Sequence, residues 1–118
     1  MNNWTIKVYE SPTKEKPVEE FIKSLNEKTQ VKIGRVLDLL EEFGLEGASS
    51  HIKKLKGTLL WEIRIIGGDN IRILYVTIKG KIFLLLHGFK KKKQKTPRKE
   101  IFIAEKRLID YESRENTA

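Results

Sequence analysis

The chain has 118 residues, a formal net charge of +8 and no cysteine. This length suits a single domain, residues 1–118, which buries roughly two-thirds of its unfolded surface and needs no covalent staples. Without cysteine, neither a disulfide framework nor a thiolate metal site can form. No apolar run reaches the roughly 18 residues of a membrane span, and the first residues do not resemble a signal peptide. We therefore expect a cytoplasmic protein with no membrane partner.

The positive charge is concentrated in the middle of the chain. Residues 50–99 contain fourteen Lys or Arg and two Asp or Glu, a net charge of +12, whereas residues 1–49 and 100–118 each carry −2. A one-sided basic block attracts polyanions and speeds their capture. The alternatives are a basic surface that serves solubility alone, a membrane surface or an acidic partner protein. No long basic amphipathic helix favours a membrane.

The first 49 residues predict one strand and two helices. Residues 4–10 alternate as in a strand and are followed by a proline that ends it. Pro17 suits a first helical turn, and apolar residues follow it at helical spacing. A second helix is predicted over residues 31–43, with Gly44 as its stop. We interpret both apolar stripes as core.

The rest of the chain predicts three strands and a final helix. Residues 59–66, 71–78 and 81–89 read as strands joined by tight turns. The last helix begins at Thr96-Pro97 as N-cap and first position, and residues 112–118 are expected to fray. Its predicted buried stripe is Ile101, Ala104, Leu108 and Tyr111. The order β-α-α-β-β-β-α predicts an α+β domain in which an antiparallel hairpin sheet packs on helices on one face.

Turn lengths predict which residues lie opposite each other in these hairpins. A two-residue turn at Lys79-Gly80 places Arg72 opposite His87, and a three-residue loop before residue 70 places Arg64 opposite Arg72. One sheet face then carries Trp61, Ile63, Ile65, Ile71, Ile73, Tyr75, Leu84 and Leu86. The other face carries Glu62, Arg64, Arg72, His87, Leu74, Val76, Phe83 and Leu85.

The opposed arginines indicate an anionic ligand. Like charges directly across a sheet lower stability by a few tenths to about 1 kcal/mol, so a ligand that both arginines reach would explain them. Alternatively, Glu62 pairs with one arginine while the other points to solvent. The flanking basic residues are Lys53, Lys54, Lys56, Lys90, Lys91, Lys92, Lys93, Lys95, Arg98 and Lys99. Lysines at strand ends also protect sheets against aggregation.

The residue types favour RNA chemistry without a metal or a cofactor. The basic third holds only Glu62 and Asp69 as carboxylates, too few for a two-metal site, and two histidines without cysteine make a zinc site improbable. The 2′-hydroxyl of RNA can instead attack the neighbouring phosphate, if the protein stabilises the added charge and moves two protons. Arginine suits the charge, and a histidine or a lysine among other cations suits proton transfer.

Several segments resemble the phage-derived branch of the RelE/HigB family. They are Lys54-Leu55-Lys56-Gly57, Leu60-Trp61-Glu62-Ile63-Arg64, Arg72-Ile73-Leu74-Tyr75, the run from Leu85 to Lys91 and Gln94-Lys95-Thr96-Pro97. The resemblance implies a RelE-like fold with helices on one sheet face and RNA on the other. It also implies a toxin that cuts messenger RNA in the ribosomal decoding site. Its partner would be a cognate antitoxin with a helix-turn-helix domain, through which alone the complex reaches operator DNA.

The resemblance also implies roles for individual residues. Arg64 and Arg72 match the strand arginines that bind the scissile phosphate, and Lys54 or Lys56 matches a basic catalytic position. His87 is similar to the end-of-strand residue used for proton transfer. The remaining candidates are assigned to RNA binding away from the scissile bond: Lys53, Lys90, Lys91, Lys92, Lys93, Lys95 and Arg98. The tyrosine expected in RelE has no clear counterpart, because Tyr111 falls on the apolar stripe, and the general acid and base stay open.

Two other functions are compatible with the same sequence. A ParE-like inhibitor of DNA gyrase shares the fold but needs no nuclease centre, so the cluster of Arg64, Arg72 and His87 argues against it. A non-catalytic RNA-binding module would present stacking aromatic residues on the open sheet face. Only Phe83 and Phe89 are candidates there. The sequence therefore favours the ribonuclease.

Overall fold

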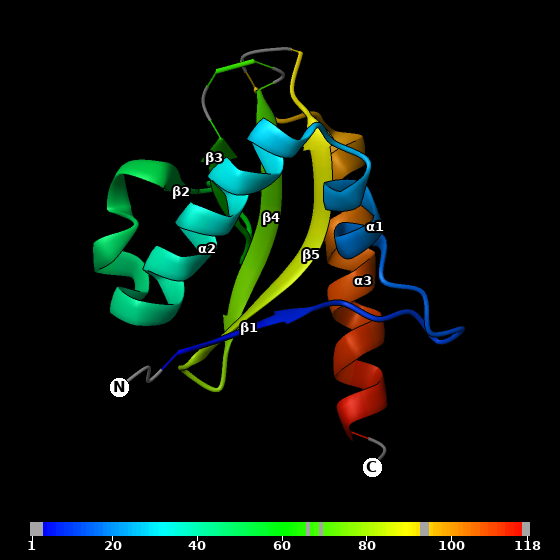
Figure 1. The fold of residues 1–118 in the computed structure, drawn as a ribbon. Coiled ribbons are helices and arrows are strands. Elements are labelled where there is room, and N and C mark those ends of the chain that lie inside the picture. The colour runs from blue at the N-terminus through cyan, green and yellow to red at the C-terminus, as the bar shows by residue number, and fades with distance from the viewer. Residues whose placement is uncertain (1–3, 66, 69, 93–94, 117–118) are drawn as a thin grey trace.

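The structure, a computed structural model, describes residues 4–65, 67–68, 70–92 and 95–116. Its elements in chain order are β1 (Thr5–Val8), α1 (Pro17–Lys23), α2 (Glu27–Gly47), a 3-10 turn (Ser49–His51), β2 (Ile52–Lys54), β3 (Trp61–Ile65), β4 (Ile71–Ile78), β5 (Ile82–Lys90) and α3 (Arg98–Asn116) (Figure 1). The predicted α+β class is confirmed. The short edge strand β2 was not predicted.

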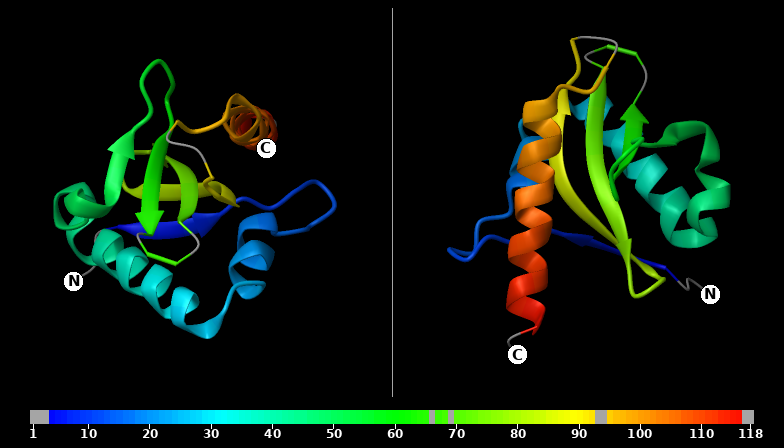
Figure 2. Two further views of the ribbon diagram at one scale, coloured as in Figure 1. Left: turned by 90° about the horizontal axis from the view of Figure 1, so that it is seen from above. Right: turned by 180° about the vertical axis from the view of Figure 1, so that it is seen from behind.

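The strands form one five-stranded sheet in the order β1-β5-β4-β3-β2. β1 runs parallel to β5, and the other neighbours are antiparallel. Helices cover both faces of the sheet, with α1 and α2 on one side and α3 on the other (Figure 2). The predicted single helix-covered face is therefore wrong, because the apolar stripe of α3 packs on the face opposite to α1 and α2.

Each side of the sheet has its own apolar core. The core under α1 and α2 includes Ile63, Ile73, Tyr75, Phe83 and Leu85 from the sheet. The core under α3 is built from Leu55, Leu60, Leu74, Val76, Leu84, Leu86 and Phe89, together with Ala104 and Leu108 of the helix. Ile101 and Tyr111 pack at its border, so the predicted buried stripe of the last helix is confirmed.

The register of β3 with β4 is confirmed, whereas that of β4 with β5 is wrong. Arg64 lies opposite Arg72, as predicted. The second turn is longer than two residues, because Ile78 pairs with Ile82. Tyr75 then pairs with Leu85 but Leu74 pairs with His87, which leaves Leu86 as the extra residue of a β-bulge.

The longer turn reverses the predicted faces of residues 83–86, and the bulge returns His87 to the α3 face. Phe83 and Leu85 belong to the core under α1 and α2. Leu84 and Leu86 belong to the core under α3. All four residues therefore lie on the face opposite to the predicted one, because a slip of one residue turns every side chain over.

Two helix ends also differ from the prediction. α2 continues to Gly47, but Gly44 does interrupt it with a non-helical φ of 70°. A Cβ at Gly44 would lie 2.7 Å from the indole of Trp4, so glycine suits both the backbone and the packing. α3 continues to Asn116, so the predicted fraying is wrong for residues 112–116, and residues 117–118 lie outside the described residues. Arg114 donates a hydrogen bond to Asp110 at 2.6 Å and another to the carbonyl oxygen of Glu10, which fastens this end of the helix.

Among the described residues, no helix is both long enough and apolar enough to cross a membrane.

Candidate active site

The site lies on the α3 face of the sheet, where Glu62 and Arg64 of β3 and Arg72 of β4 place charged side chains beside the apolar core. Arg64 and Arg72 are direct cross-strand partners there. The Nε atoms of both are buried, and neither has a hydrogen-bond partner among the described residues. One terminal nitrogen of Arg72 donates to the carbonyl oxygen of Ile71 at 3.1 Å. The other terminal N–H groups of the two guanidinium groups can donate to an anion that approaches the two arginine side chains on this face of the sheet.

Glu62 is the acidic centre of this face, and its side chain is only 1% exposed. Its Oε1 lies 3.4 Å from Nε of Arg72 and 3.9 Å from Nζ of Lys91. Its Oε2 accepts a hydrogen bond from the hydroxyl of Thr96, at the entry to α3. The sequence placed Glu62 on this face and offered its pairing with one arginine as an alternative. The structure shows that pairing, with Lys91 as a second cation.

Lys91 and Lys53 complete a cluster of four cations around Glu62. Lys53 on β2 lies directly opposite Glu62 on β3. The Lys91 side chain is 11% exposed. Partial burial lowers the pKa of Lys91, and the charges of Arg72, Lys53 and Arg64 lower it further, while Glu62 raises it. We call Lys53, Arg64, Arg72 and Lys91, with Glu62 between them, the arginine site.

Lys54 and Lys56, the predicted basic catalytic position, lie outside the arginine site. Lys54 pairs with Trp61, whose side chain packs against the core on the other face of the sheet. The ammonium of Lys54 donates hydrogen bonds to the carbonyl oxygens of Leu55 and Thr58 within the following turn. Lys56 is exposed in that turn. The structure brings Lys53, rather than either of these two lysines, beside the arginines.

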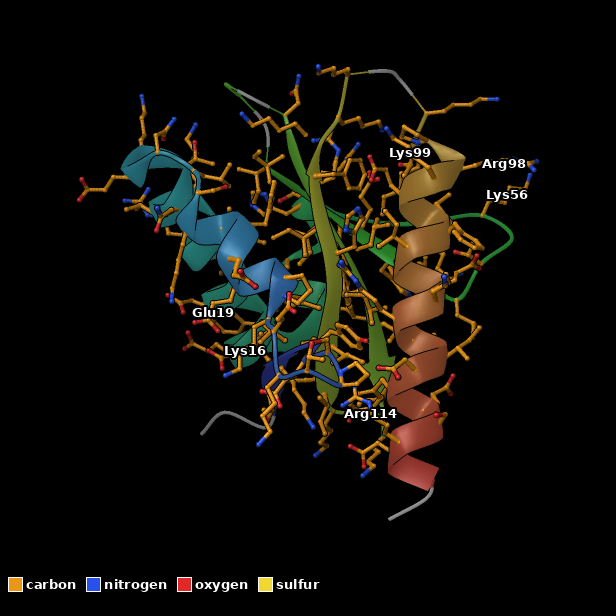
Figure 3. The ribbon with its side chains drawn as sticks, turned by 90° about the vertical axis from the view of Figure 1, so that its right-hand side faces the viewer. Lys16, Glu19, Lys56, Arg98, Lys99 and Arg114 are labelled. Atoms are coloured by element: carbon orange, nitrogen blue, oxygen red, sulfur yellow. The ribbon has the colours of Figure 1, made fainter. Side chains whose placement is uncertain are left out.

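Most of the predicted RNA-binding residues form an exposed rim. Lys92, Lys95 and Arg98 are exposed, and Arg98 and Lys99 lie at the N-terminal end of α3 (Figure 3). Lys90 is exposed at the end of β5, where it pairs with Ile71. Lys93 lies outside the described residues. Lys91 departs from this group, because its side chain turns inward to Glu62.

His87 lies on the same sheet face but is held by α3. Its Nε2 is 2.7 Å from Oε1 of Glu100, and its Nδ1 is 3.2 Å from a terminal nitrogen of Arg107. Because a guanidinium can only donate, Nδ1 accepts and Nε2–H donates to the carboxylate. Burial lowers the pKa of His87; the hydrogen bond to Glu100 opposes this and the charge of Arg107 adds to it. The ring is therefore neutral near neutral pH.

Phe89 separates the histidine from the arginines. It lies directly opposite Arg72, and its ring stacks on the imidazole of His87 with 5.6 Å between centroids. The structure thus brings His87 near the arginine site but not opposite Arg72, the position that the sequence predicted.

The chain matches the family model described as phage-derived protein Gp49-like over residues 20–109, which is more than half of its length. It belongs to the Gp49-like family. It is also similar to the crystal structure of archaeal RelE-RelB complex from Pyrococcus horikoshii OT3, with a TM-score of 0.57 and 22% identity over 77% of this chain and 98% of that chain. This likeness shows a RelE-like fold. No curated protein matches the chain.

These findings confirm the resemblance to the phage-derived branch of the RelE/HigB family and the predicted RelE-like fold. Sequence reasoning missed two residues that define the surroundings of His87 in this Gp49-like chain. Glu100 and Arg107 are seven residues apart, so they lie on the same side of α3, two turns from each other. Their spacing was visible in the sequence, but the bulge that turns His87 toward them was not.

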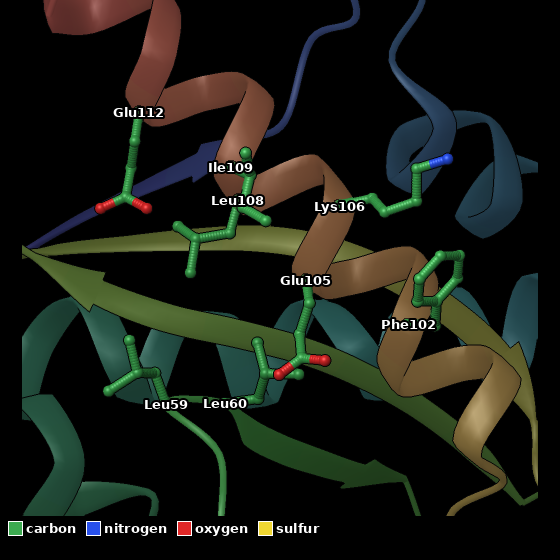
Figure 4. Close-up of a pocket in the computed structure, with 8 residues that line it drawn as sticks. All are labelled: Leu59, Leu60, Phe102, Glu105, Lys106, Leu108, Ile109 and Glu112. Atoms are coloured by element: carbon green, nitrogen blue, oxygen red, sulfur yellow. The ribbon is translucent and has the colours of Figure 1, made fainter.

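An apolar groove lies along α3, away from the arginine site. This groove of about 370 Å³ runs between α3 and the segment before β3, and Leu59, Phe102 and Ile109 expose large apolar surfaces there (Figure 4). The charged residues that line it are Glu105, Glu112 and Lys106. A groove that is apolar and carries more carboxylates than cations does not suit RNA. The cationic face around Glu62 is therefore the candidate RNA site.

Proposed function

We propose that this Gp49-like protein is the toxin of a toxin-antitoxin system and an endoribonuclease that cleaves messenger RNA on the translating ribosome. The observation that carries the proposal is the pair of directly opposed arginines, whose buried Nε atoms have no hydrogen-bond partner among the described residues. Two like charges in such contact lower stability. A phosphate bound by both arginines would offset the repulsion between them and accept hydrogen bonds from their guanidinium groups.

In the proposed reaction, the 2′-oxygen of one nucleotide attacks the adjacent phosphorus. The bond from phosphorus to the 5′-oxygen breaks, leaving a 2′,3′-cyclic phosphate and a free 5′-hydroxyl. One proton leaves the attacking hydroxyl and one is delivered to the departing oxygen. Arg64 and Arg72 would stabilise the extra negative charge of the transition state, because guanidinium groups stay protonated and bind phosphate through two N–H groups.

The proton-transfer residues are part of the proposal. His87 stays a candidate, but both of its ring nitrogens are engaged, by Glu100 and Arg107. It can exchange a proton with RNA only after one of these partners releases it. Lys54 and Lys56 stay candidates that would have to move toward the arginine site when RNA binds. The exposed lysines and Arg98 would bind message or ribosomal phosphates outside the scissile bond.

The partners in this proposal are messenger RNA, the ribosome and a cognate antitoxin in the cytoplasm. The antitoxin would carry a helix-turn-helix domain, and the toxin would reach operator DNA only through it. The RelE-like fold, shared with the RelE of an archaeal RelE-RelB complex, supports an antitoxin partner.

The test is to express the chain in cells with and without its neighbouring gene and to map RNA ends on translated messages. We expect growth arrest without the neighbour and new message ends with cyclic phosphates inside coding regions. Purified gyrase is assayed for supercoiling in parallel. Intact messages together with inhibited supercoiling would indicate a ParE-like gyrase inhibitor and would overturn the proposal. Salt-dependent RNA binding without cleavage would replace it by a binding module.

A further inference from the structure

We propose that Glu62 is a positioning residue of the arginine site: its carboxylate holds the ammonium of Lys91 beside the guanidinium of Arg72, so that both bind the same phosphate. This inference rests on the ribonuclease function proposed above. It moves Lys91 from the outer basic rim into the reacting site.

The contacts of Glu62 divide between its two oxygens. Oε1 is shared by two cations, with 3.4 Å to Nε of Arg72 and 3.9 Å to Nζ of Lys91. Oε2 accepts from the hydroxyl of Thr96, which fixes the carboxylate in one orientation. Oε1 itself accepts no hydrogen bond among the described residues. Its contribution is therefore a charge placed between two cations that would otherwise repel each other.

Stability alone does not explain a carboxylate at this position. Its neighbour across the sheet is Leu74, a fully buried residue of the core under α3. Replacing a buried ion pair by well-packed apolar residues is often neutral or stabilising, so an apolar residue could fill this place. A negative charge also weakens attraction for RNA. Glu62 therefore works against both stability and simple polyanion binding, and a role in arranging the cations accounts for it.

A backbone hydrogen bond holds Lys91 at the point where its side chain turns inward. The backbone N–H of Lys91 donates to the carbonyl oxygen of Asn70 at 2.9 Å, which ties the end of β5 to the start of β4. Its sequence neighbours Lys90 and Lys92 are exposed, whereas the Lys91 side chain is 11% exposed. Glu62 thus joins β3, the end of β5 and, through Thr96, the entry to α3.

A flexible lysine needs such a restraint to act on a defined phosphate. Its ammonium is a point charge on a four-carbon stem, and holding it in place before RNA arrives removes an entropic cost from the transition state. The Arg72 guanidinium and the Lys91 ammonium are both within ion-pair distance of the same carboxylate oxygen. A phosphate oxygen that approaches this pair would meet two donors already oriented.

The experiment measures single-turnover cleavage of ribosome-bound message at saturating protein, over a range of pH. Glu62→Gln and Lys91→Gln should each slow cleavage by on the order of tenfold or more, the scale expected for a displaced catalytic group. RNA affinity should be unchanged or higher in Glu62→Gln, since a negative charge has been removed. The double variant should be no slower than the slower single variant, because both changes remove one interaction. Glu105→Gln and Lys81→Gln, exposed residues elsewhere, are the charge-matched controls and should cleave like the parent.

The pH profile separates positioning from a merely structural role. Since Glu62 raises the pKa of Lys91, Glu62→Gln should move the alkaline limb of the rate profile to lower pH. If Glu62→Gln does not fold, Glu62→Asp keeps the charge on a side chain one methylene shorter and should show the same slower rate. Parental cleavage by Lys91→Gln or by Glu62→Asp, or an unmoved alkaline limb in folded Glu62→Gln, would overturn the inference.

A binding measurement distinguishes failure of this inference from failure of the proposed function. Inorganic phosphate is titrated into each protein while the side-chain nitrogen signals of arginine and lysine are followed by NMR. In the parent, phosphate should perturb Arg72 and Lys91 together, and in Glu62→Gln it should perturb Arg72 alone. Perturbation of both residues in both proteins would overturn the role of Glu62. A parent protein that leaves messages intact would instead overturn the ribonuclease function.

Discussion

Nε of Arg72 lies 3.4 Å from Oε1 of Glu62, yet neither atom makes a hydrogen bond with the described residues. The two groups are therefore held together by the attraction of their charges and not by a hydrogen bond. Because this Nε is buried, a phosphate would reach Arg72 through its terminal guanidinium nitrogens. A phosphate that enters the arginine site can recruit the guanidinium while the carboxylate keeps its contact with Lys91.

Arg72→Ala should abolish growth arrest and message cleavage, because it removes half of the opposed arginine pair. It should also lower the free energy of unfolding, on the order of 3 kcal/mol, because a buried carboxylate loses one of the two described cations within ion-pair distance of it. Cleavage of reporter messages and urea unfolding check the two effects separately. A variant as toxic as the parent would show that Arg72 is not part of the reacting site.

Phosphate should stabilise the parent protein more than chloride does at equal ionic strength. A ligand at a hundred times its Kd adds about 2.7 kcal/mol to the free energy of unfolding. Arg64→Gln should lose this response to phosphate. In chloride the same variant should gain a few tenths to about 1 kcal/mol, because the repulsion across the strands is gone. Thermal melts of both proteins in both salts give the comparison, and equal responses to phosphate would exclude Arg64 from the anion site.

The exposed rim should contribute affinity rather than rate. Replacing Lys92, Lys95 and Arg98 together by Gln should weaken ribosome binding and flatten its salt dependence. Each phosphate contact that is lost lowers the number of counterions released on binding. Single-turnover cleavage at saturation should change little. Binding titrations at several salt concentrations test this, and a lost saturating rate would place the rim in the transition state.

His87 should make the folded state less stable as the solution becomes acidic. Burial lowers the pKa of His87 in the folded protein, so the unfolded chain takes up its proton first. The contribution of neutral His87 to stability is therefore complete above the ordinary histidine pKa of about 6.5, and it falls as the pH decreases below that value. Urea unfolding at pH 7.5 and 5.5 should show a smaller loss in His87→Gln than in the parent. Equal losses in the two proteins would mean that His87 titrates normally.

Gly88→Ala should destabilise the fold through a steric clash. A Cβ at this position would lie 2.4 Å from Cδ2 of Phe21, so the Phe21 ring, α1 or β5 must move. Forced overpacking of this kind costs about 1–3 kcal/mol. Gly34→Ala is the matched control, because its Cβ meets nothing within 4 Å, and alanine in the helix should stabilise by about 1 kcal/mol. Thermal unfolding should give a lower melting temperature for Gly88→Ala and a higher one for Gly34→Ala. A Gly88→Ala protein as stable as the parent would refute the predicted clash.

The sequence by itself determined the helices, every strand except β2, the α+β class and the pairing of β3 with β4. Apolar and charged residues alternate on β3, and its apolar positions pair with Ile71, Ile73 and Tyr75 of β4. A register shifted by one residue would therefore place charges under α1 and α2. That pairing placed Arg64 opposite Arg72 and identified the cationic face before any coordinates.

Only the tertiary structure decided which groups surround those arginines. One added residue in the β4–β5 turn and the extra Leu86 in β5 turned His87 toward Glu100 and Arg107 of α3. A run of consecutive lysines contains no signal that Lys91 turns inward, because that depends on Glu62, a residue 29 positions away on another strand. Local pattern predicts the strands and the faces of β3 and β4, whereas contacts between distant segments decide the faces of β5 and the surroundings of the site.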